Sequence, residues 1–266
     1  MTRPLITLLT DFGTKDSYVA EMKGVILGIC PSADIVDISH EVDKFSIRMG
    51  AYILASATRY FPKGTINVAV VDPGVGTRRR GLCVETAHGF YVGPDNGLLA
   101  LATQNQGIKR THVIRNHQFM LSNVSSTFHG RDVFAPVAAH LANGIKPSNL
   151  GPETKKILVP KFATVVRDRN RVVGEVIHID AFGNTVMNIA KREIGTRTGR
   201  RLRFKTDARE IELKFYKTYG EVEPGEPLTL IGSHGFLEIA VNQGDASKVF
   251  KLKSGDPIAV YLKRLS

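Results

Sequence analysis

The sequence contains only two cysteines and no hydrophobic run long enough to cross a bilayer. Cys30 and Cys83 each have apolar neighbours, so we expect two buried thiols in a reducing compartment, and neither a disulfide nor a metal site. A transmembrane helix needs about 20 apolar residues. The apolar stretch Leu5–Leu9 is also too short for the core of a secretory signal peptide. These features favour a soluble, cytoplasmic protein that binds no membrane.

The charge is strongly positive, with 36 Lys and Arg against 25 Asp and Glu. Such an excess raises the question of a nucleic-acid partner. However, both halves of the chain share the excess, few aromatic residues accompany it, and no nucleic-acid-binding motif occurs. The densest basic stretch runs from Arg197 to Lys205, where we expect a solvated loop. A basic adenosine- or nucleic-acid-binding module therefore remains only as a non-enzymatic alternative.

The first half alternates short β-branched runs with helical spacing, which is typical of β-α-β units around a largely parallel sheet. Strands are expected at residues 5–10, 33–38, 65–71, 81–86 and 90–92. Three helices are expected: one from Asp16 to Pro31, one capped by Ser46 with an inner face that extends to Phe61, and one over 131–143 that ends at Gly144.

The pattern changes to strands and turns in the second half. Strands are expected at residues 172–179, 210–215, 228–231, 237–241 and 257–262. Their short length indicates a small antiparallel β-barrel. The predicted organisation is an N-terminal α/β domain over 1–152, a linker over 153–170 and a C-terminal β-barrel over 171–266.

Two acidic residues follow predicted strands of the first half. Asp11 comes directly after the first strand and Asp72 after the third. Ligands of open α/β sheets bind at the carboxyl ends of the strands, so Asp11 is well placed to bind a ribose diol. Asp72 opens the segment DPGVGTRRR, whose glycines permit close approach to a ligand and whose arginines, from Arg78 to Arg80, add fixed charge.

His129 differs from the other histidines because it precedes Gly130 at a junction between a loop and a helix. The seven other histidines lack the spacing of metal ligands. In the second half, Asp180 and Asn184 flank a strand end, and a second polar turn lies between Gly232 and Glu238. An amide can bind a base edge and an acid can bind an ammonium, although both segments also fit simple hairpin turns.

Five segments in this order resemble the S-adenosylmethionine hydroxide adenosyltransferase family, the relatives of fluorinase and chlorinase. They are LTDFG (9–13), VDPGVG (71–76), FHGRD (128–132), FGN (182–184) and GS (232–233). The resemblance covers the whole chain. It implies an N-terminal α/β domain, a C-terminal barrel and a homotrimer whose sites lie between subunits. It also implies hydrolysis of S-adenosylmethionine to adenosine and methionine, without a cofactor.

The same resemblance assigns the site residues. Asp72, Arg79 and His129 match the catalytic set of the hydrolases, with Arg78 the alternative to Arg79. Asp11 would hold the ribose. Adenine would be bound by Asn184, the backbone near Val241 and Tyr219, and the methionine ammonium by Asp180 with Ser233 and Glu238 nearby.

Two rival reactions are weighed against hydrolysis. A fluorinase has a tyrosine at the position of Asp72 and a hydroxyl-bearing loop where this chain has Val75, and this chain lacks an obvious extra loop between Asn96 and Ile108. These differences favour water over halide as the nucleophile. A metal-dependent nucleotide phosphatase would be expected to carry paired acids, but Phe12 follows Asp11.

Overall fold

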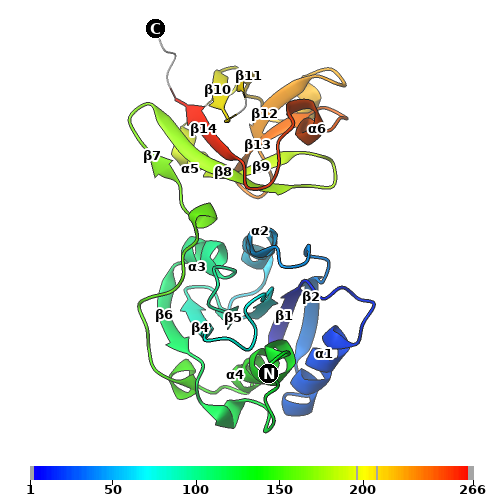
Figure 1. The fold of residues 1–266 in the computed structure, drawn as a ribbon, viewed down its shortest axis with the longest axis vertical. Coiled ribbons are helices and arrows are strands. Elements are labelled where there is room, and N and C mark those ends of the chain that lie inside the picture. The colour runs from blue at the N-terminus through cyan, green and yellow to red at the C-terminus, as the bar shows by residue number, and fades with distance from the viewer. Residues whose placement is uncertain (1–2, 196, 208, 263–266) are drawn as a thin grey trace. The chain divides into compact units, whose positions relative to one another are not determined.

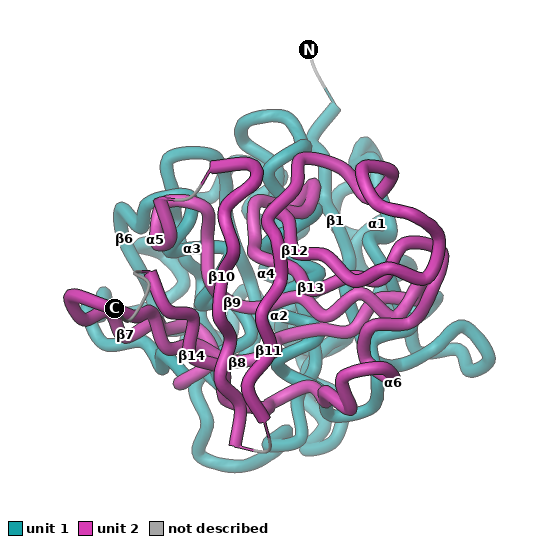
Figure 2. The backbone as a smooth tube through the Cα atoms, turned by 90° about the horizontal axis from the view of Figure 1, so that it is seen from above, with its two compact units in different colours: residues 1–160 teal, residues 161–266 magenta. Residues whose placement is uncertain are grey.

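The computed structural model describes residues 3–195, 197–207 and 209–262. Contacts between Cα atoms divide the chain into two compact units, residues 1–160 and 161–266, which Figure 2 colours separately. Within the described residues, no helix is both long and apolar enough to span a membrane. Cys30 and Cys83 are both buried free thiols, as expected, and burial raises the pKa of Cys83 to about 12.

The first unit is a three-layer α/β/α structure (Figure 1). Its sheet has the order β2-β1-β3-β5-β4-β6, in which β1, β2, β3 and β5 are parallel and β4 is antiparallel to both neighbours. Helices α1 and α4 pack together on one face, and α2 and α3 on the other. The strands are β1 (Leu5–Thr10), β2 (Asp34–Ser39), β3 (Ile66–Val70), β4 (Gly81–Thr86), β5 (Phe90–Pro94) and β6 (Ile108–Val113). The helices are α1 (Tyr18–Ile29), α2 (Ile47–Ala57), α3 (Ala100–Gln106) and α4 (Ala135–Ala142).

The core of this unit explains why the strands were predictable. The residues of β3 are buried on both faces because helices cover both sides of the sheet. On one face, Met22 and Ile26 of α1 and Val137 of α4 join apolar residues of β1 and β3 in one cluster. A continuous β-branched run is what such a strand requires.

The helix predictions were wrong in two places, and α3 was not predicted. Helix α2 ends at Ala57 and a 3-10 turn follows, so Phe61 lies beyond the helix. Ser46 occupies the N-cap position, but its side chain makes no capping hydrogen bond to the described residues. The predicted helix over 131–143 is a π-helical turn at Gly130–Phe134 followed by α4. Pro136 lacks the N–H that an α-helix would direct to the Asp132 carbonyl, which accepts from Leu121 N instead at 2.9 Å.

The second unit is an antiparallel sheet that curls into a nearly closed barrel. Its strand order is β11-β10-β14-β8-β9-β13-β12, with β7 paired to β8, and a bridge between Phe215 and Thr229 connects the two ends. The strands are β7 (Val166–Arg167), β8 (Arg171–Ile179), β9 (Thr185–Ala190), β10 (Arg201–Lys205), β11 (Glu210–Lys214), β12 (Pro227–Ile231), β13 (Phe236–Val241) and β14 (Pro257–Tyr261). Two short helices accompany them, α5 (Lys191–Ile194) and α6 (Ala246–Phe250).

The expectation of a solvated basic loop over Arg197 to Lys205 was wrong for its second half. Residues 201–205 form β10, in which Leu202 and Phe204 are buried in the barrel core. The basic residues of β10 alternate with these two and face outward. Arg201 and Arg203 pair across the sheet with Glu212 and Glu210 of β11, so opposite charges neutralise part of this surface.

Candidate active site

The two acids expected at the sheet edge do leave neighbouring strands. Thr10 and Val70, the last residues of β1 and β3, are directly paired in a parallel register. Asp11 follows the first and Asp72 lies two residues after the second. Because β1 is flanked by β2 on one side and β3 on the other, this edge is the point where the strand order reverses, the usual ligand site of an open α/β sheet.

Arg79 connects Asp72 to His129. Two guanidinium donors of Arg79, Nε and Nη2, converge on Oδ2 of Asp72 at 2.8 and 2.5 Å. The same Nη2 lies 2.8 Å from Nδ1 of His129. The Arg79 guanidinium also lies over the ring of Phe134, 5.1 Å from its centroid. The three predicted catalytic side chains therefore form one connected group.

The second carboxylate oxygen of Asp72 is left open by this arrangement. Both donors of Arg79 approach Oδ2, and Oδ1 is buried without a hydrogen-bond partner among the described residues. An unsatisfied buried acceptor is costly in a folded protein, so such an atom calls for a water or ligand. Asp72 lines a cavity, so a molecule that reaches Oδ1 from this cavity would supply the missing donor.

The turn after Asp72 selects Arg79 over its neighbour. Arg78 is exposed, whereas the Arg79 side chain is only 11% exposed. Gly76 has φ +75°, and a Cβ there would lie 2.2 Å from the carbonyl oxygen of Ser126. Only glycine tolerates both conditions, so the Asp72 turn can pack directly on the loop that leads to His129.

Local electrostatics set the protonation of His129. Burial and the charge of Arg79 lower the pKa of this histidine, against smaller opposite effects of Asp72 and Asp132. Because an arginine can only donate hydrogen bonds, Nδ1 of His129 must accept, and the proton of the neutral ring must be on Nε2. His129 is therefore neutral near pH 7, with a donor at Nε2.

Asp11 is held by the backbone of the neighbouring loop. Its Oδ2 accepts a hydrogen bond from Phe45 N at 2.8 Å. Burial raises the pKa of Asp11 and the negative charge of Asp72 adds to this effect, while the bond from Phe45 opposes it. Phe45 itself has φ 65°, an unfavourable conformation for a residue with a side chain. Phe45 therefore donates its N–H to Asp11 while its backbone is in a conformation that is strained for this residue type.

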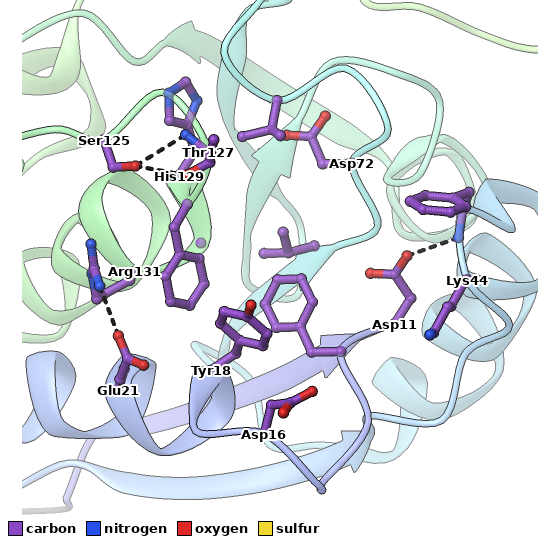
Figure 3. Close-up of a pocket in the computed structure, with 16 residues that line it drawn as sticks. Asp11, Asp16, Tyr18, Glu21, Lys44, Asp72, Ser125, Thr127, His129 and Arg131 are labelled. Carbon is purple, nitrogen blue, oxygen red and sulfur yellow. Dashed lines mark hydrogen bonds and ion pairs between the residues drawn. The ribbon is translucent and has the colours of Figure 1, made fainter.

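A cavity of about 580 Å³ joins these residues (Figure 3). Asp11, Asp72 and His129 all line it, together with residues to which the sequence analysis assigned no role in the site. These further residues are Phe12, Asp16, Tyr18, Glu21, Lys44, Phe45, Val70, Val75, Ser125, Thr127, Phe128, Gly130 and Arg131. Phe12, Phe128 and Arg131 belong to motifs that the sequence analysis quoted, whereas Lys44 and Phe45 lie in an ordinary polar loop without any motif.

One wall of the cavity is an aromatic cluster backed by an ion-pair network. Phe12, Tyr18 and Phe128 contact one another, with ring centroids 5.1–5.7 Å apart. The Arg131 guanidinium lies over Phe128 and donates to Glu21 at 2.7 Å (Figure 3). It also donates to the fully buried Asp132 at 2.7 Å. This network joins α1 to the π-helical turn that follows His129.

The predicted residues of the second unit form two separate clusters. In the turn between β8 and β9, Oδ1 of Asp180 accepts from the backbone N–H groups of Phe182 and Asn184, and Oδ2 accepts from the Asn184 side-chain amide. Gly183 has φ +82°, and a Cβ there would collide with Asp245. The Asp180 carboxylate thus maintains this turn and positions the Asn184 amide.

Glu238 is the centre of the second cluster. It is buried on β13, and its Oε2 accepts a hydrogen bond from the Tyr219 hydroxyl at 2.9 Å. Burial raises the pKa of Glu238, and the nearby Asp180 adds to the rise while the Tyr219 bond opposes it. A Cβ on Gly232 would lie 1.7 Å from Oε1 of Glu238, so the turn that carries Ser233 packs against this carboxylate. Val241 ends the same strand β13.

None of these clusters is arranged as a metal site. Among residues 3–195, 197–207 and 209–262, no group of three or more His, Cys, Asp or Glu side chains is placed to hold a metal ion.

Comparisons with known proteins agree over nearly the full length of the chain. The chain is 40% identical to the (R)-S-adenosyl-L-methionine hydrolase of Methanocaldococcus jannaschii, over 96% of this chain and 95% of the relative. It is 36% identical to the hydrolase of the same name from Thermus thermophilus, over 95% and 98% of the two chains. A fluorinase of Nocardia brasiliensis is more distant, at 28% identity.

A crystal structure of an uncharacterized conserved protein from Thermotoga maritima superposes with a TM-score of 0.87 at 40% identity, over 96% of this chain and 99% of the other. Residues 6–151 match the N-terminal domain of the SAM hydroxide adenosyltransferases, and residues 174–259 match the C-terminal domain. The chain therefore belongs to the SAM hydroxide adenosyltransferase family.

Proposed function

We propose that this protein hydrolyses S-adenosyl-L-methionine to adenosine and L-methionine. The observation that carries the proposal is the Asp72 carboxylate, a residue that lines the cavity: its Oδ2 is held by Arg79, and its Oδ1 is buried and unpartnered in the described structure. Oδ1 can accept a hydrogen bond from a water molecule. Membership of the family and the hydrolases at 36–40% identity support the choice of substrate.

The chemistry requires little beyond the placement of this water. The sulfonium of the substrate is a good leaving group, so its departure needs no proton donor. A water aligned behind the ribose 5′-carbon and opposite to sulfur attacks, the new C–O bond forms as the C–S bond breaks, and the electron pair of that bond stays on methionine. Holding the reactants in such a geometry can account for about 7–11 kcal/mol of barrier lowering.

Asp72 orients the water and takes its proton. A carboxylate is a weak base compared with hydroxide, so we infer that the proton moves late in the attack, when the water oxygen has become acidic. Arg79 holds the carboxylate in place, and it also fixes the tautomer of His129. In this scheme, the Nε2 donor of His129 holds the oxygen of the same water.

The remaining predicted residues bind the substrate. We propose that Asp11 accepts hydrogen bonds from the ribose hydroxyls at the same sheet edge. In the second unit, the Asn184 amide, the Val241 backbone and Tyr219 would bind adenine. Asp180, Ser233 and Glu238 would bind the methionine end. We further propose a cytoplasmic homotrimer without cofactor, in which the second unit of a neighbouring subunit completes each site.

Asp72 also favours water over halide. In this family's halogenating relatives, the resemblance places a tyrosine at this position, and a carboxylate would repel an incoming halide. Fluorinases are also the more distant relatives, at 28% identity against 36–40% for the hydrolases.

The direct test is incubation of the purified protein with S-adenosylmethionine in chloride-containing and chloride-free buffer. Chromatography should detect adenosine and methionine at equal rates in both buffers. Formation of 5′-chloro-5′-deoxyadenosine would assign a halogenase instead. Absence of both nucleosides, with the protein folded by circular dichroism, would refute the proposed function. Addition of a chelator should change nothing, and a loss of activity on chelation would favour the phosphatase class.

A further inference from the structure

His40 is a buried histidine that lies close to the site but does not line the cavity. It follows β2 directly and is only 5% exposed. Its ring lies between two groups: Nδ1 is 2.9 Å from the Thr10 hydroxyl and Nε2 is 3.1 Å from Oδ1 of Asp37. Thr10 is the residue immediately before Asp11. His40 therefore contacts the residue that precedes Asp11, which is proposed to bind the substrate.

The contacts of His40 hold both sides of Asp11. On one side, the Thr10 hydroxyl contacts the ring and also accepts from Phe12 N at 3.2 Å. On the other side, Gly13 N donates to the His40 carbonyl at 2.8 Å. The Thr10 hydroxyl can accept from Phe12 and still donate its own proton to Nδ1 of His40, with the ring proton then on Nε2, the side that faces Asp37. The backbone on either side of Asp11 is thus tied to one residue.

An irregularity in the sheet puts His40 in this place. Along β1 and β2, Leu8 pairs with Asp37 but Leu9 pairs with Ser39, so the register slips by one residue. Without this slip, Ser39 would lie beside Thr10. With it, His40 does. Irregularities of this kind commonly redirect side chains next to active sites.

A pair of opposite charges lies on the outer side of the ring. Asp37 contacts His40 through one oxygen and Lys23 of α1 through the other, at 2.6 Å. Burial alone would raise the pKa of Asp37, but the contacts with Lys23 and His40 outweigh it and lower that pKa. Asp37 therefore remains a carboxylate that favours the Nε2–H tautomer of His40.

We propose that His40 is a positioning residue, which holds the turn from Thr10 to Gly13 so that the Asp11 carboxylate faces the ribose. This inference rests on the proposed function, in which Asp11 binds the ribose hydroxyls. His40 does not touch the substrate and does not take part in the attack of water. Its removal should therefore weaken binding rather than slow the chemical step.

The test compares four variants of the full-length protein. His40→Leu removes both ring contacts, whereas His40→Asn keeps an acceptor near the position of Nδ1. Thr10→Val removes the hydroxyl with little change of shape and serves if His40→Leu does not fold. His112→Leu is the matched control, because His112 is also 5% exposed but lies on β6 at the far edge of the sheet.

Loss of a hydrogen bond that leaves buried partners unsatisfied costs enough for about a tenfold effect. His40→Leu and Thr10→Val should raise the KM for S-adenosylmethionine and the Kd for adenosine by about tenfold, with kcat within about threefold of wild type. His40→Asn should recover most of the loss. His112→Leu should leave KM and Kd unchanged. If His40→Leu shifts KM no more than His112→Leu, or lowers kcat alone, the inference is wrong.

Amide hydrogen exchange separates this inference from the proposed function. Exchange at Phe12 should accelerate in His40→Leu and Thr10→Val and return toward wild type in His40→Asn. This readout requires no turnover. A wild-type protein that releases no adenosine would refute the proposed function, and unchanged exchange at Phe12 would refute the role of His40.

Discussion

Replacement of Asp72 is the sharpest test of the site, because its two oxygens have different roles. Oδ2 is held by Arg79, and the proposed mechanism assigns the unpartnered Oδ1 to the attacking water. Asp72→Asn keeps the shape of the side chain but removes the charge and most of the basicity. Asp72→Ala removes both oxygens and leaves the Arg79 guanidinium, 11% exposed, without its carboxylate.

The expected magnitudes follow from these contacts. General-base assistance is typically worth about 10²–10⁴-fold, so kcat should fall by that factor in both variants. This corresponds to a barrier increase of about 2.7–5.4 kcal/mol. Loss of one partner from a buried ion pair costs about 3–5 kcal/mol, so Asp72→Ala should also lose stability toward urea. Asp72→Asn should lose less, since an amide oxygen can still accept from Arg79.

Binding must be measured with a neutral ligand. S-adenosylmethionine is a cation at sulfur, so removal of a nearby negative charge would weaken its binding for a reason unrelated to the attack. Calorimetry with adenosine avoids this charge effect, and its Kd should stay within about threefold of wild type in Asp72→Asn, since no ground-state contact is lost. Asp11→Ala provides the contrast, because it should weaken adenosine binding. If Asp72→Asn keeps kcat within tenfold of wild type, Asp72 is not the base.

Three further predictions concern the surrounding charges and turns. Arg79→Lys should lower kcat at least tenfold because lysine cannot contact both Asp72 and His129, whereas Arg78→Lys should match wild type in the same steady-state assay. The lowered pKa of His129 means that the unfolded chain protonates first as pH falls below about 6.5. The Tm of wild type should therefore fall between pH 7 and pH 5, and the Tm of His129→Gln should fall less over the same range. Equal dependence of the two Tm values on pH would contradict a buried neutral ring. Tyr219→Phe removes the hydrogen bond that lowers the pKa of Glu238, so the pKa of Glu238 should rise further. The KM should increase and kcat should stay nearly unchanged. An unchanged KM would show that Tyr219 and Glu238 do not bind the substrate.

Periodicity in the sequence predicted most of the strands, but it missed β6, β9 and β10. β1 and β4 have the expected bounds, and the rule that parallel strands end at one edge predicted that Asp11 and Asp72 lie close together. β10 was missed because its outward residues are all basic and its two buried residues, Leu202 and Phe204, are too few for a clear pattern. Pairing with β11 and β14, rather than the composition of β10 itself, stabilises it as a strand.

Parts of the site could not be predicted because they depend on contacts distant in sequence. The conformation of Phe45 is one that no local rule predicts for phenylalanine, and its N–H bond to Asp11 joins residues 34 positions apart. His40 reaches Thr10 only because the register of β1 and β2 slips. Pro136, which interrupts the helix after His129, could be seen in the sequence. The hydrogen bond from Leu121 N to the Asp132 carbonyl, which satisfies the acceptor that Pro136 leaves free, could not.

The position of Arg79 between Asp72 and His129 explains how one site can contain an ionised carboxylate and a neutral histidine. If Asp72 faced His129 directly, the carboxylate would draw a proton onto the imidazole and lose its own basicity in an ion pair. The guanidinium prevents this, because it supplies a permanent positive charge that satisfies Oδ2 and disfavours a second charge on the ring. In the proposed mechanism, a water between Asp72 and His129 would therefore have an acceptor for its proton on one side and a donor for its lone pair on the other. Arginine is suited to this position because it does not lose its own proton to either neighbour.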